Sequence, residues 1–236
     1  MASSTCAILG DGSVGKTSIL AAFINDGFRK QYKQTIGVDF HTKNMKIRDD
    51  NVTLRLWDVG GQSIHSDSIK SYLSSVSGDS DFVFLVYDVT NVESFNNLED
   101  WIRVIKKNIA KSSKTNIFFV ANKIDMYSQR QVSEAKHNKF VKDLDITIKG
   151  SIFMSAKTGD NVVVAFYKAV SDLLGSQLSE DELQAHEKRV KVVISNTDED
   201  DGGRTLFADQ IEEEDRLAAI AAAERANNNG GCCVLS

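Results

Sequence analysis

Residues 10–17, Gly-Asp-Gly-Ser-Val-Gly-Lys-Thr, have the spacing of a phosphate-binding loop. Its glycines let several backbone N–H groups converge on phosphate oxygens, because a Cβ would block the required φ values and close approaches. Lys16 would then reach the β- and γ-phosphates, and the Thr17 hydroxyl would bind Mg²⁺. The alternative is a glycine turn that arose by chance. The pattern therefore favours a nucleoside triphosphate site.

A second candidate is Asp58, which follows a run of alternating apolar residues and precedes Val-Gly-Gly-Gln. A carboxylate at the end of a strand beyond the phosphate loop is where the second Mg²⁺ contact of this class of enzyme belongs. Gly61 would offer its backbone N–H to the γ-phosphate. The alternative is an ordinary Asp-x-Gly turn at the end of a hairpin.

The elements that position these residues alternate between strands and helices. Apolar runs and period-2 patterns predict strands, and apolar residues at helical spacing predict helices. We expect strands at 6–9, 38–47, 52–57, 81–88, 117–121 and 146–154, a hairpin turn at 49–51, a loop at 26–35, a loop and a short helix within 63–80, and helices at 16–25, 91–110, 133–144 and 162–178. This order predicts an α/β P-loop fold of three layers, with a six-stranded, mostly parallel sheet, one antiparallel strand and helices on both faces.

Two further polar motifs also follow predicted strands. Asn122-Lys123-Ile124-Asp125 comes after the strand at 117–121, and Ser155-Ala156-Lys157 comes after the strand at 146–154. Open α/β sheets bind ligands at this edge. Together with the phosphate loop, Thr35 and Asp58 to Gly61, these motifs resemble the five nucleotide elements of Ras-like small GTPases. The resemblance covers about residues 5–176.

The resemblance implies that the cofactors are GTP or GDP and Mg²⁺. Phe28 would stack on guanine, Asn122 and Asp125 would read its edge, Lys123 would brace the phosphate loop, and the Ala156 N–H would meet the guanine oxygen. A carboxylate at Asp125 accepts two N–H bonds that guanine offers and adenine cannot. The implied nucleotide-binding residues are Gly12, Ser13, Val14, Gly15, Lys16, Thr17, Ser18, Phe28, Thr35, Gly61, Asn122, Lys123, Asp125, Ser155, Ala156 and Lys157; the metal ligands are Thr17, Thr35 and Asp58; the catalytic residues are Gln62, Lys16 and Thr35.

Within that superfamily the chain is similar to Rab proteins. The similar segments are Ile36-Gly37-Val38-Asp39-Phe40, Trp57-Asp58, Tyr87-Asp88-Val89-Thr90 and Glu93-Ser94-Phe95 followed by Asn97-Leu98. Phe40, Trp57 and Tyr72 fall where Rabs carry an aromatic triad that shapes the effector surface, so we expect effectors to bind through Ile36 to Phe40, Trp57 and Tyr72. The alternative is that these aromatic residues belong to the core.

The resemblance implies a GTP-hydrolysing switch that recruits effectors to a membrane in vesicular or endosomal trafficking. Gln62 would orient the attacking water. Expected partners are an exchange factor, a GTPase-activating protein and a prenyl-binding carrier, and the protein is expected to be a monomer. Val59, Gly60 and Ser63 depart from the usual Rab sequence, which leaves the regulators open. If Gly60 misplaces Gln62, the alternative is a binding module that holds GTP with little hydrolysis.

The C-terminal part of the 236-residue chain differs in composition from the rest. Residues 179–236 contain 14 acidic and 6 basic residues, a net charge of −8, whereas the whole chain carries −5. We expect a GTPase domain at 1–178 and an acidic, largely disordered tail at 179–236. The net charge and the lack of a basic cluster argue against a nucleic-acid partner, and no run of 18 apolar residues indicates a membrane span.

The last residues are Cys232-Cys233-Val234-Leu235-Ser236. A cysteine, two aliphatic residues and a terminal serine form a prenylation box, which predicts a farnesyl group on Cys233. Cys232 is the candidate second site, for palmitoylation, because stable anchoring usually takes two signals. We therefore expect the protein on the cytoplasmic face of endosomal or plasma membranes, with a cytosolic pool.

Overall fold

The computed structural model describes residues 2–24, 34–61, 81–108, 116–144, 146 and 148–194, with side chains described as far as residue 187. The chain divides into two units. The first comprises residues 1–126 and 130–198, and the second comprises residues 127–129 and 199–236. In the second unit, the described residues form one short 3₁₀ helix, η2 (Tyr127–Gln129). The sheet and the α-helices belong to the first unit.

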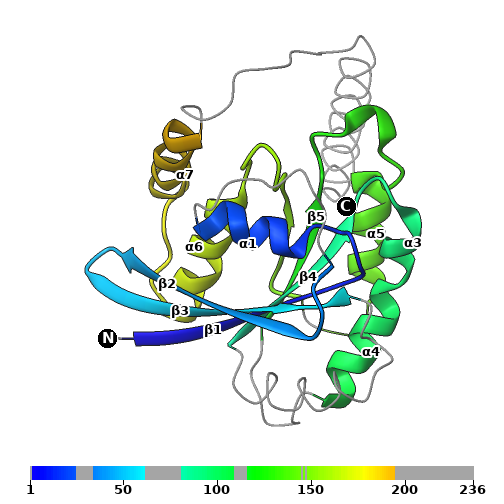
Figure 1. Cartoon of the computed structure of the whole chain (residues 1–236), viewed down its shortest axis with the longest axis horizontal. Helices are drawn as coiled ribbons and strands as arrows, with labels where there is room; N and C mark the ends of the chain where they lie inside the picture. The colour runs from blue at the N-terminus through cyan, green and yellow to red at the C-terminus, as the bar shows by residue number, and fades with distance from the viewer. Residues whose placement is uncertain are drawn as a thin grey trace, which may run out of the picture. The chain divides into compact units, whose positions relative to one another are not determined.

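A six-stranded sheet forms the centre of the first unit (Figure 1). Its strands, in spatial order, are β2 (Val38–Ile47), β3 (Asp50–Val59), β1 (Ala2–Leu9), β4 (Phe82–Asp88), β5 (Asn116–Asn122) and β6 (Gly150–Phe153). Every neighbouring pair is parallel except β2 and β3, which form an antiparallel hairpin. The predicted fold class is therefore confirmed.

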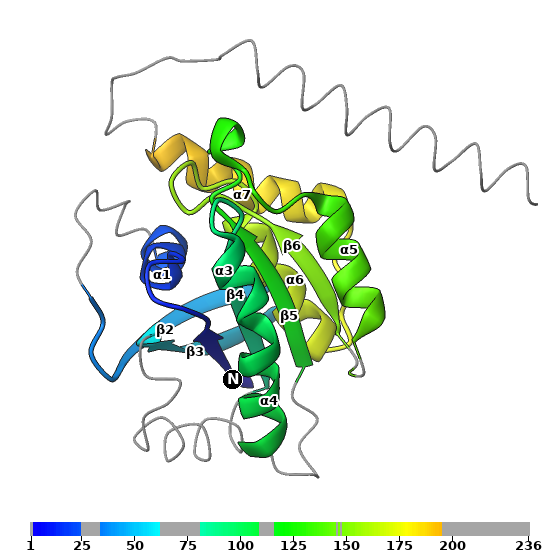
Figure 2. The ribbon, with the colours of Figure 1, turned by 90° about the vertical axis from the view of Figure 1, so that its right-hand side faces the viewer.

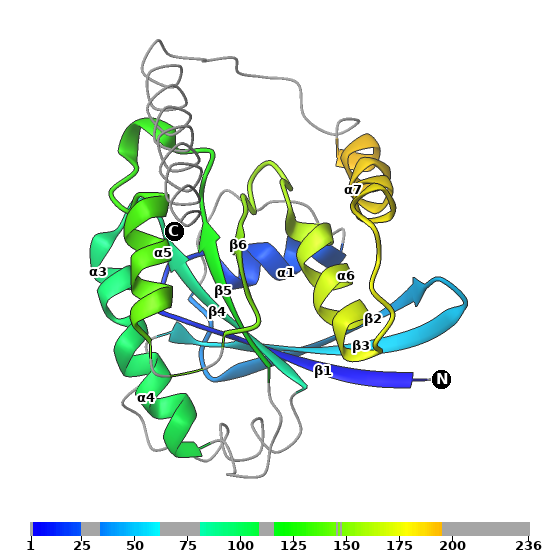
Figure 3. The same cartoon turned by 180° about the vertical axis from the view of Figure 1, so that it is seen from behind.

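Helices cover both faces of this sheet (Figures 2 and 3). The helices α1 (Lys16–Ile24) and α6 (Val162–Leu173) pack on one face, and α3 (Val92–Asn96), α4 (Leu98–Asn108) and α5 (Glu134–Asp143) pack on the other. The strand β1 shows why both faces are apolar: Cys6 and Ile8 belong to the first cluster, whereas Ala7 and Leu9 belong to the second. Alternate side chains of a strand point to opposite faces, so a strand buried on both sides is an unbroken apolar run.

The hairpin between β2 and β3 has a different turn from the one predicted. Ile47 pairs with Asp50, so Arg48 and Asp49 make the turn, while Asp50 and Asn51 are already in β3. Arg48 adopts a left-handed φ of 52°. A two-residue turn of this kind matches the twist of its strands.

Three other predicted elements differ in extent. The helix expected over 91–110 is interrupted at Asn97, where α3 ends and α4 begins. The strand expected over 146–154 pairs with β5 only through residues 150–153. The helix α6 ends at Leu173 rather than at residue 178, because Gly175 two residues later has a φ of 67°, a conformation that commonly terminates helices.

A further helix, α7 (Glu180–Ile194), lies where the sequence predicts a largely disordered tail. The remaining tail residues, 195–236, are outside the described residues, as is the loop and helix expected within 63–80. No helix in the described part of the chain is long and apolar enough to cross a membrane.

Candidate nucleotide site

The predicted phosphate loop joins β1 to α1. Its backbone has positive φ at Gly10 (134°), Ser13 (62°) and Gly15 (97°). A Cβ on Gly10 would lie 2.1 Å from the Val86 carbonyl oxygen, and one on Gly15 would lie 2.3 Å from the Asn122 side-chain nitrogen. Both glycines are thus required by the φ angle and by the neighbouring strand ends.

Lys16 lies under this loop and is only 6% exposed. Its ammonium donates hydrogen bonds to the carbonyl oxygens of Gly10 (2.8 Å) and Asp11 (2.6 Å). Burial lowers the pKa of Lys16 to about 8, although the negative charges of Asp58 and Asp11 act in the opposite direction. The loop therefore holds a buried cation that a phosphate group would stabilise.

The three predicted metal ligands come together beside the loop. The Thr17 hydroxyl donates to Asp58 Oδ2 at 2.5 Å and lies 3.0 Å from the Thr35 hydroxyl, which is 3.5 Å from the same carboxylate oxygen. Asp58 is fully buried, and its Oδ1 has no hydrogen-bond partner among the described residues. Burial raises the pKa of Asp58, while the Thr17 bond and the Lys16 charge oppose this shift. Oxygen ligands with a buried, unpaired carboxylate oxygen suit a hard cation such as Mg²⁺.

Gly60 and Gly61 pack tightly between two loops. The Gly60 N–H donates to the Gly37 carbonyl oxygen at 2.9 Å, and a Cβ on Gly60 would lie 2.5 Å from the Thr35 carbonyl oxygen. A Cβ on Gly61 would lie 2.2 Å from the Asp11 carbonyl carbon. Both glycines therefore lie against the backbone of neighbouring loops, with no room for a side chain.

The predicted guanine-binding residues form a second cluster, at the ends of β5 and β6. The Asn122 side chain donates to the Val14 carbonyl oxygen (2.8 Å) and accepts from the Ala156 N–H (3.0 Å). The Ser155 hydroxyl donates to an Asp125 carboxylate oxygen at 2.6 Å. Asn122 thus connects the phosphate loop to the loop that contains Ser155 and Ala156.

Among the described residues, Lys123 pairs with a carboxylate at the end of β4 and makes no hydrogen bond to the phosphate loop. Its ammonium forms an ion pair with Asp88 Oδ2 at 2.6 Å. The Asp88 side chain also accepts hydrogen bonds from the backbone and hydroxyl of Thr90. Sequence reasoning missed Asp88 as the partner of Lys123, although a carboxylate at the end of β4, in register with Asn122 of β5, was an available signal.

Asp11 is a second residue whose role was missed. Its carboxylate accepts a hydrogen bond from the Trp101 indole (2.8 Å) and another from the Asn97 side chain (2.7 Å). Both donors come from the junction of α3 and α4, and Trp101 is fully buried. The phosphate loop is therefore fastened from its outer side as well as by Lys16.

The remaining predicted residues fall into two groups. Ser13 and Lys157 are exposed, whereas Gly12 and Ser18 are half-buried. Phe28, Gln62, Tyr72, Cys232 and Cys233 lie outside the described residues. Their assignments stay predictions.

An exposed apolar surface begins directly after Thr35. Ile36 is 88% exposed and Phe40 is 61% exposed, and the Phe40 ring meets the half-buried Trp57 ring edge-on with a centroid distance of 5.3 Å. Phe40 is therefore not a core residue. Large exposed apolar side chains that lie together mark interaction sites.

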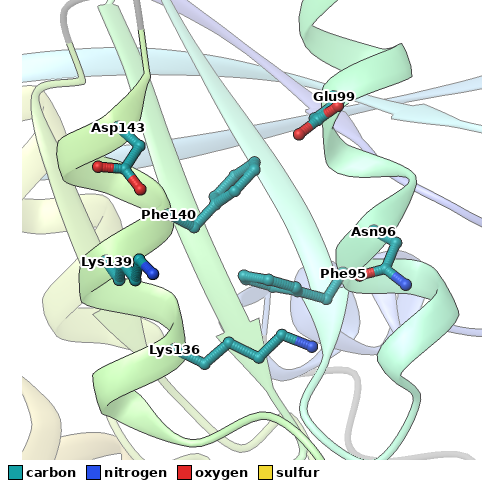
Figure 4. A pocket seen from close by; sticks show the side chains of 7 residues that line it. All are labelled: Phe95, Asn96, Glu99, Lys136, Lys139, Phe140 and Asp143. Atoms are coloured by element: carbon teal, nitrogen blue, oxygen red, sulfur yellow. The ribbon is translucent and has the colours of Figure 1, made fainter.

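A groove elsewhere in the fold contains none of the predicted site residues (Figure 4). It lies between α3, α4 and α5 and has a volume of about 440 Å³. The rings of Phe95 and Phe140 face each other across it with a centroid distance of 5.0 Å. Its rim carries both signs of charge, from Glu99, Lys136, Lys139 and Asp143.

Comparison with known proteins is consistent with this geometry. The sequence matches the Ras family over residues 5–175. It is also 41% identical over 181 residues to the Ras-related protein Rab-28 of Caenorhabditis elegans, an alignment that covers 75% of this chain and 70% of the relative.

Proposed function

Because the chain belongs to the Ras family as a Rab-type small GTPase, a GTP-hydrolysing molecular switch, we propose that its GTP-bound state recruits effector proteins to a membrane in vesicular or endosomal transport. One observation carries this proposal. Thr35 lies at the cluster of metal-binding oxygens, and the exposed Ile36 and Phe40 follow it directly in the chain. Loss of the γ-phosphate would therefore release Thr35 and move the exposed apolar residues that follow it.

The described residues support binding of both GTP and Mg²⁺. Thr17, Thr35 and Asp58 would hold the metal ion, which neutralises phosphate charge when bound. Lys16 would donate to the phosphates in place of its two backbone acceptors. Because Lys16 is buried, its charge acts in a surrounding of low dielectric, where it stabilises developing negative charge more strongly than in water.

We assign the positioning of the attacking water to Gln62, which follows Gly61. Gly61 packs against Asp11 of the phosphate loop, and its backbone N–H would donate to the γ-phosphate. The chain would supply little covalent chemistry of its own, since phosphoryl transfer depends mainly on positioning and charge stabilisation.

Guanine selectivity would come from the second cluster. Asp125, oriented by the Ser155 hydroxyl, would accept two N–H bonds from the base. The Ala156 N–H, whose acceptor in this structure is Asn122, would donate to the guanine oxygen. Adenine lacks this pattern, so GTP and GDP are the expected nucleotides.

The alternative function is a module that holds GTP with little hydrolysis. It depends on Gly60 misplacing Gln62. The hydrogen bond from Gly60 to Gly37 and its close packing against Thr35 count against that idea, because they fix the backbone that leads to Gln62.

Regulators of the proposed switch are of three kinds. Exchange factors and GTPase-activating proteins would act on the nucleotide site, with Gly12 leaving space for an arginine from the activating protein. A prenyl-binding carrier would account for a cytosolic pool. The proposed lipid anchor, with a farnesyl group on Cys233 and a palmitoyl group on Cys232, rests on sequence alone.

The effector surface can be tested with protein held in the GTP state by a non-hydrolysable GTP analogue. We expect capture of partner proteins from a cell extract that depends on the GTP analogue and falls at least tenfold for Ile36→Ser with Phe40→Ala. Nucleotide affinity should stay within threefold of wild type. Leu174→Ser is the matched control, because Leu174 is also an exposed apolar residue, at 37%. Equal capture by both variants, or equal capture in the GDP state, would contradict the proposal.

A further inference from the structure

The helix α7 lies beyond the region that matches the Ras family, which ends at residue 175. Its N-terminus is a reciprocal capping box. The Glu182 N–H donates to the Ser179 hydroxyl at 3.3 Å, and the Ser179 N–H donates to Glu182 Oε2 at 2.8 Å. The capping box therefore fixes the residue at which α7 begins.

Four residues on one face of α7 contact the rest of the unit. The contacting residues are Glu182, Leu183, His186 and Glu187, at the spacing of one helical face. Leu183 is only 8% exposed, and the His186 ring stacks on Tyr167 of α6 with a centroid distance of 4.0 Å. These two residues dock α7 against α6; Figure 3 shows the two helices in succession.

The first turn of α7 is tied to the β2–β3 hairpin. Arg48, in the hairpin turn, donates to the Gln177 carbonyl oxygen at 2.8 Å and to the Glu182 carboxylate at 3.4 Å. Both side chains of this ion pair are about half exposed, at 50% and 41%. Exposed pairs of this kind contribute little on their own, so the pair mainly sets the direction of the helix.

The second turn of α7 reaches the predicted guanine-binding loop. Glu187 Oε1 accepts the Asn161 backbone N–H at 2.9 Å. Asn161 has a left-handed φ of 59°, makes no side-chain cap for α6, and instead donates its side-chain amide to the Phe153 carbonyl oxygen at 2.8 Å. Glu187 thus satisfies a backbone group at the point where the loop joins α6.

Asn161 is closely linked to the residues assigned to the base. The Asp160 carbonyl oxygen accepts the Ser155 N–H at 3.1 Å, and the Gly159 N–H donates to the Ser155 carbonyl oxygen at 2.9 Å. The loop from Ser155 to Asn161 is therefore compact, and a shift at Asn161 would be passed to Ser155 and Ala156.

We propose that α7 is a docked brace of the guanine-binding loop, in which Glu187 is a positioning residue that slows nucleotide release. The proposal rests on the assignment of Ser155 and Ala156 to the guanine site. When α7 detaches, the loop loses its outer support and the nucleotide leaves faster.

The test is stopped-flow release of fluorescent nucleotides from the full-length protein. Two nucleotides are compared: GDP, and 2-aminopurine riboside diphosphate, which lacks both the guanine oxygen that the Ala156 N–H would bind and the N1–H that would donate to Asp125. For Glu187→Ala we expect GDP release to be about 5- to 10-fold faster, the effect of one lost hydrogen bond. Release of the 2-aminopurine nucleotide should change less than twofold.

Three further variants complete the design. Glu187→Gln keeps an acceptor oxygen and should stay within twofold of wild type. Gln184→Ala, a matched control at an exposed position of the same helix, should not change the ratio of the two release rates. Leu183→Ser removes the apolar contact of α7 and should accelerate GDP release as Glu187→Ala does, which tests docking without altering Glu187.

The proposal would be overturned if Glu187→Ala released GDP at the wild-type rate, or if the variant released both nucleotides faster by the same factor. A wild-type protein that does not prefer GDP to the 2-aminopurine nucleotide would overturn the guanine assignment and the proposal with it. These two failures are distinguishable because the second is seen in wild type alone.

Discussion

The phosphate half and the guanine half of the proposed nucleotide site are built differently. In the phosphate half, glycines fit where any Cβ would lie within 2.5 Å of neighbouring atoms, as at Gly10, Gly15, Gly60 and Gly61. In the guanine half, side chains bond to one another and to backbone groups, through Asn122, Asp125 and Ser155. The first half is fixed by excluded volume and the second by a hydrogen-bond network.

This difference has consequences for how each half responds to change. A Cβ that overlaps a neighbouring backbone atom cannot be accommodated by a small shift, so replacing a glycine of the phosphate half should strongly reduce stability. A hydrogen-bond network can shift by tenths of an ångström, and it can be supported from outside, as Glu187 of α7 does at Asn161. We therefore expect the phosphate half to set whether nucleotide binds, and the guanine half to set which nucleotide binds and how long it stays.

Gly10→Ala should give the largest effect. The new Cβ would lie 2.1 Å from the Val86 carbonyl oxygen at a φ of 134°, so the ends of β1 and β4 would have to separate. We expect the free energy of unfolding to fall by more than about 4 kcal/mol, measured by urea denaturation. Gly37→Ala is the control, because Gly37 also has a positive φ (79°) but has no atom within 4 Å of the Cβ position. Its cost should be about 1–2 kcal/mol. Equal costs would show that φ, not volume, governs the phosphate half.

Asp125→Asn should change which nucleotide binds without unfolding the protein. An amide offers a donor where the carboxylate offers only acceptors, so xanthine nucleotides should be preferred to guanine nucleotides. We expect GDP affinity to fall about a thousandfold, measured by displacement of a fluorescent nucleotide. Ser155→Ala, which removes the hydroxyl that donates to Asp125 and accepts the Thr158 N–H, should cost about tenfold. Wild-type protein that binds ADP as tightly as GDP would contradict the assignment.

Trp101→Phe tests whether the phosphate half is also supported by hydrogen bonds. The variant keeps a buried ring but loses the indole N–H that donates to Asp11. Removing a donor from a carboxylate should cost about 1–3 kcal/mol in unfolding free energy and speed GDP release about tenfold. Trp57→Phe, at a half-buried ring, is the control and should cost under about 1 kcal/mol. If GDP release from Trp101→Phe matches wild type, the Asp11 contacts do not position the loop.

The smallest expected effect concerns His137, which lies in neither half. Burial lowers its pKa to about 4, with the positive charge of Arg130 adding to the shift, and its Nδ1 lies 3.1 Å from the Tyr87 hydroxyl. The unfolded chain, with a pKa of about 6.5, binds the proton more tightly, so stability falls as pH drops from about 6.5 towards 4. We expect a loss of about 1 kcal/mol between pH 7 and pH 5.5 from this group. Between pH 7 and pH 5.5, the free energy of unfolding of His137→Leu should fall by about 1 kcal/mol less than that of wild type, whatever the stability of the variant at pH 7. Identical pH dependence would show that His137 does not titrate in this range.

Short motifs in the sequence predicted the convergence of Thr17 and Asp58, because each follows one of two parallel strands, which end at the same edge of the sheet, whereas Thr35 was assigned through the family resemblance. The burial of β4 on both faces was equally predictable, since an unbroken apolar run such as Phe82–Asp88 is typical of a strand covered on both faces. The hydrogen bonds that hold the phosphate loop from outside could not be predicted in this way. The Asp11–Trp101 bond joins residues 90 positions apart, and neither residue type by itself indicates the other.

The helix α7 was missed for a different reason. Residues 179–194 are rich in charge, which is typical of a disordered segment, although one helical face carries Ser179, Glu182, Leu183, His186 and Glu187. The turn of the β2–β3 hairpin was misplaced by about one residue because Asp50 and Asn51 are common turn residues. Cross-strand pairing, such as Met45 with Val52, decides the register instead.

Single-turnover hydrolysis of GTP by wild type and by Gln62→Leu, with Mg²⁺ and after its removal by chelation, tests the proposed switch most directly. Wild type should convert bound GTP to GDP only with Mg²⁺. Gln62→Leu should be at least tenfold slower while its GTP affinity stays within threefold, as expected for a group that acts mainly in the transition state. A Gln62→Leu variant that hydrolyses GTP at the wild-type rate, or wild-type hydrolysis that is unchanged without Mg²⁺, would contradict the roles proposed for Gln62 and for the Thr17, Thr35 and Asp58 cluster.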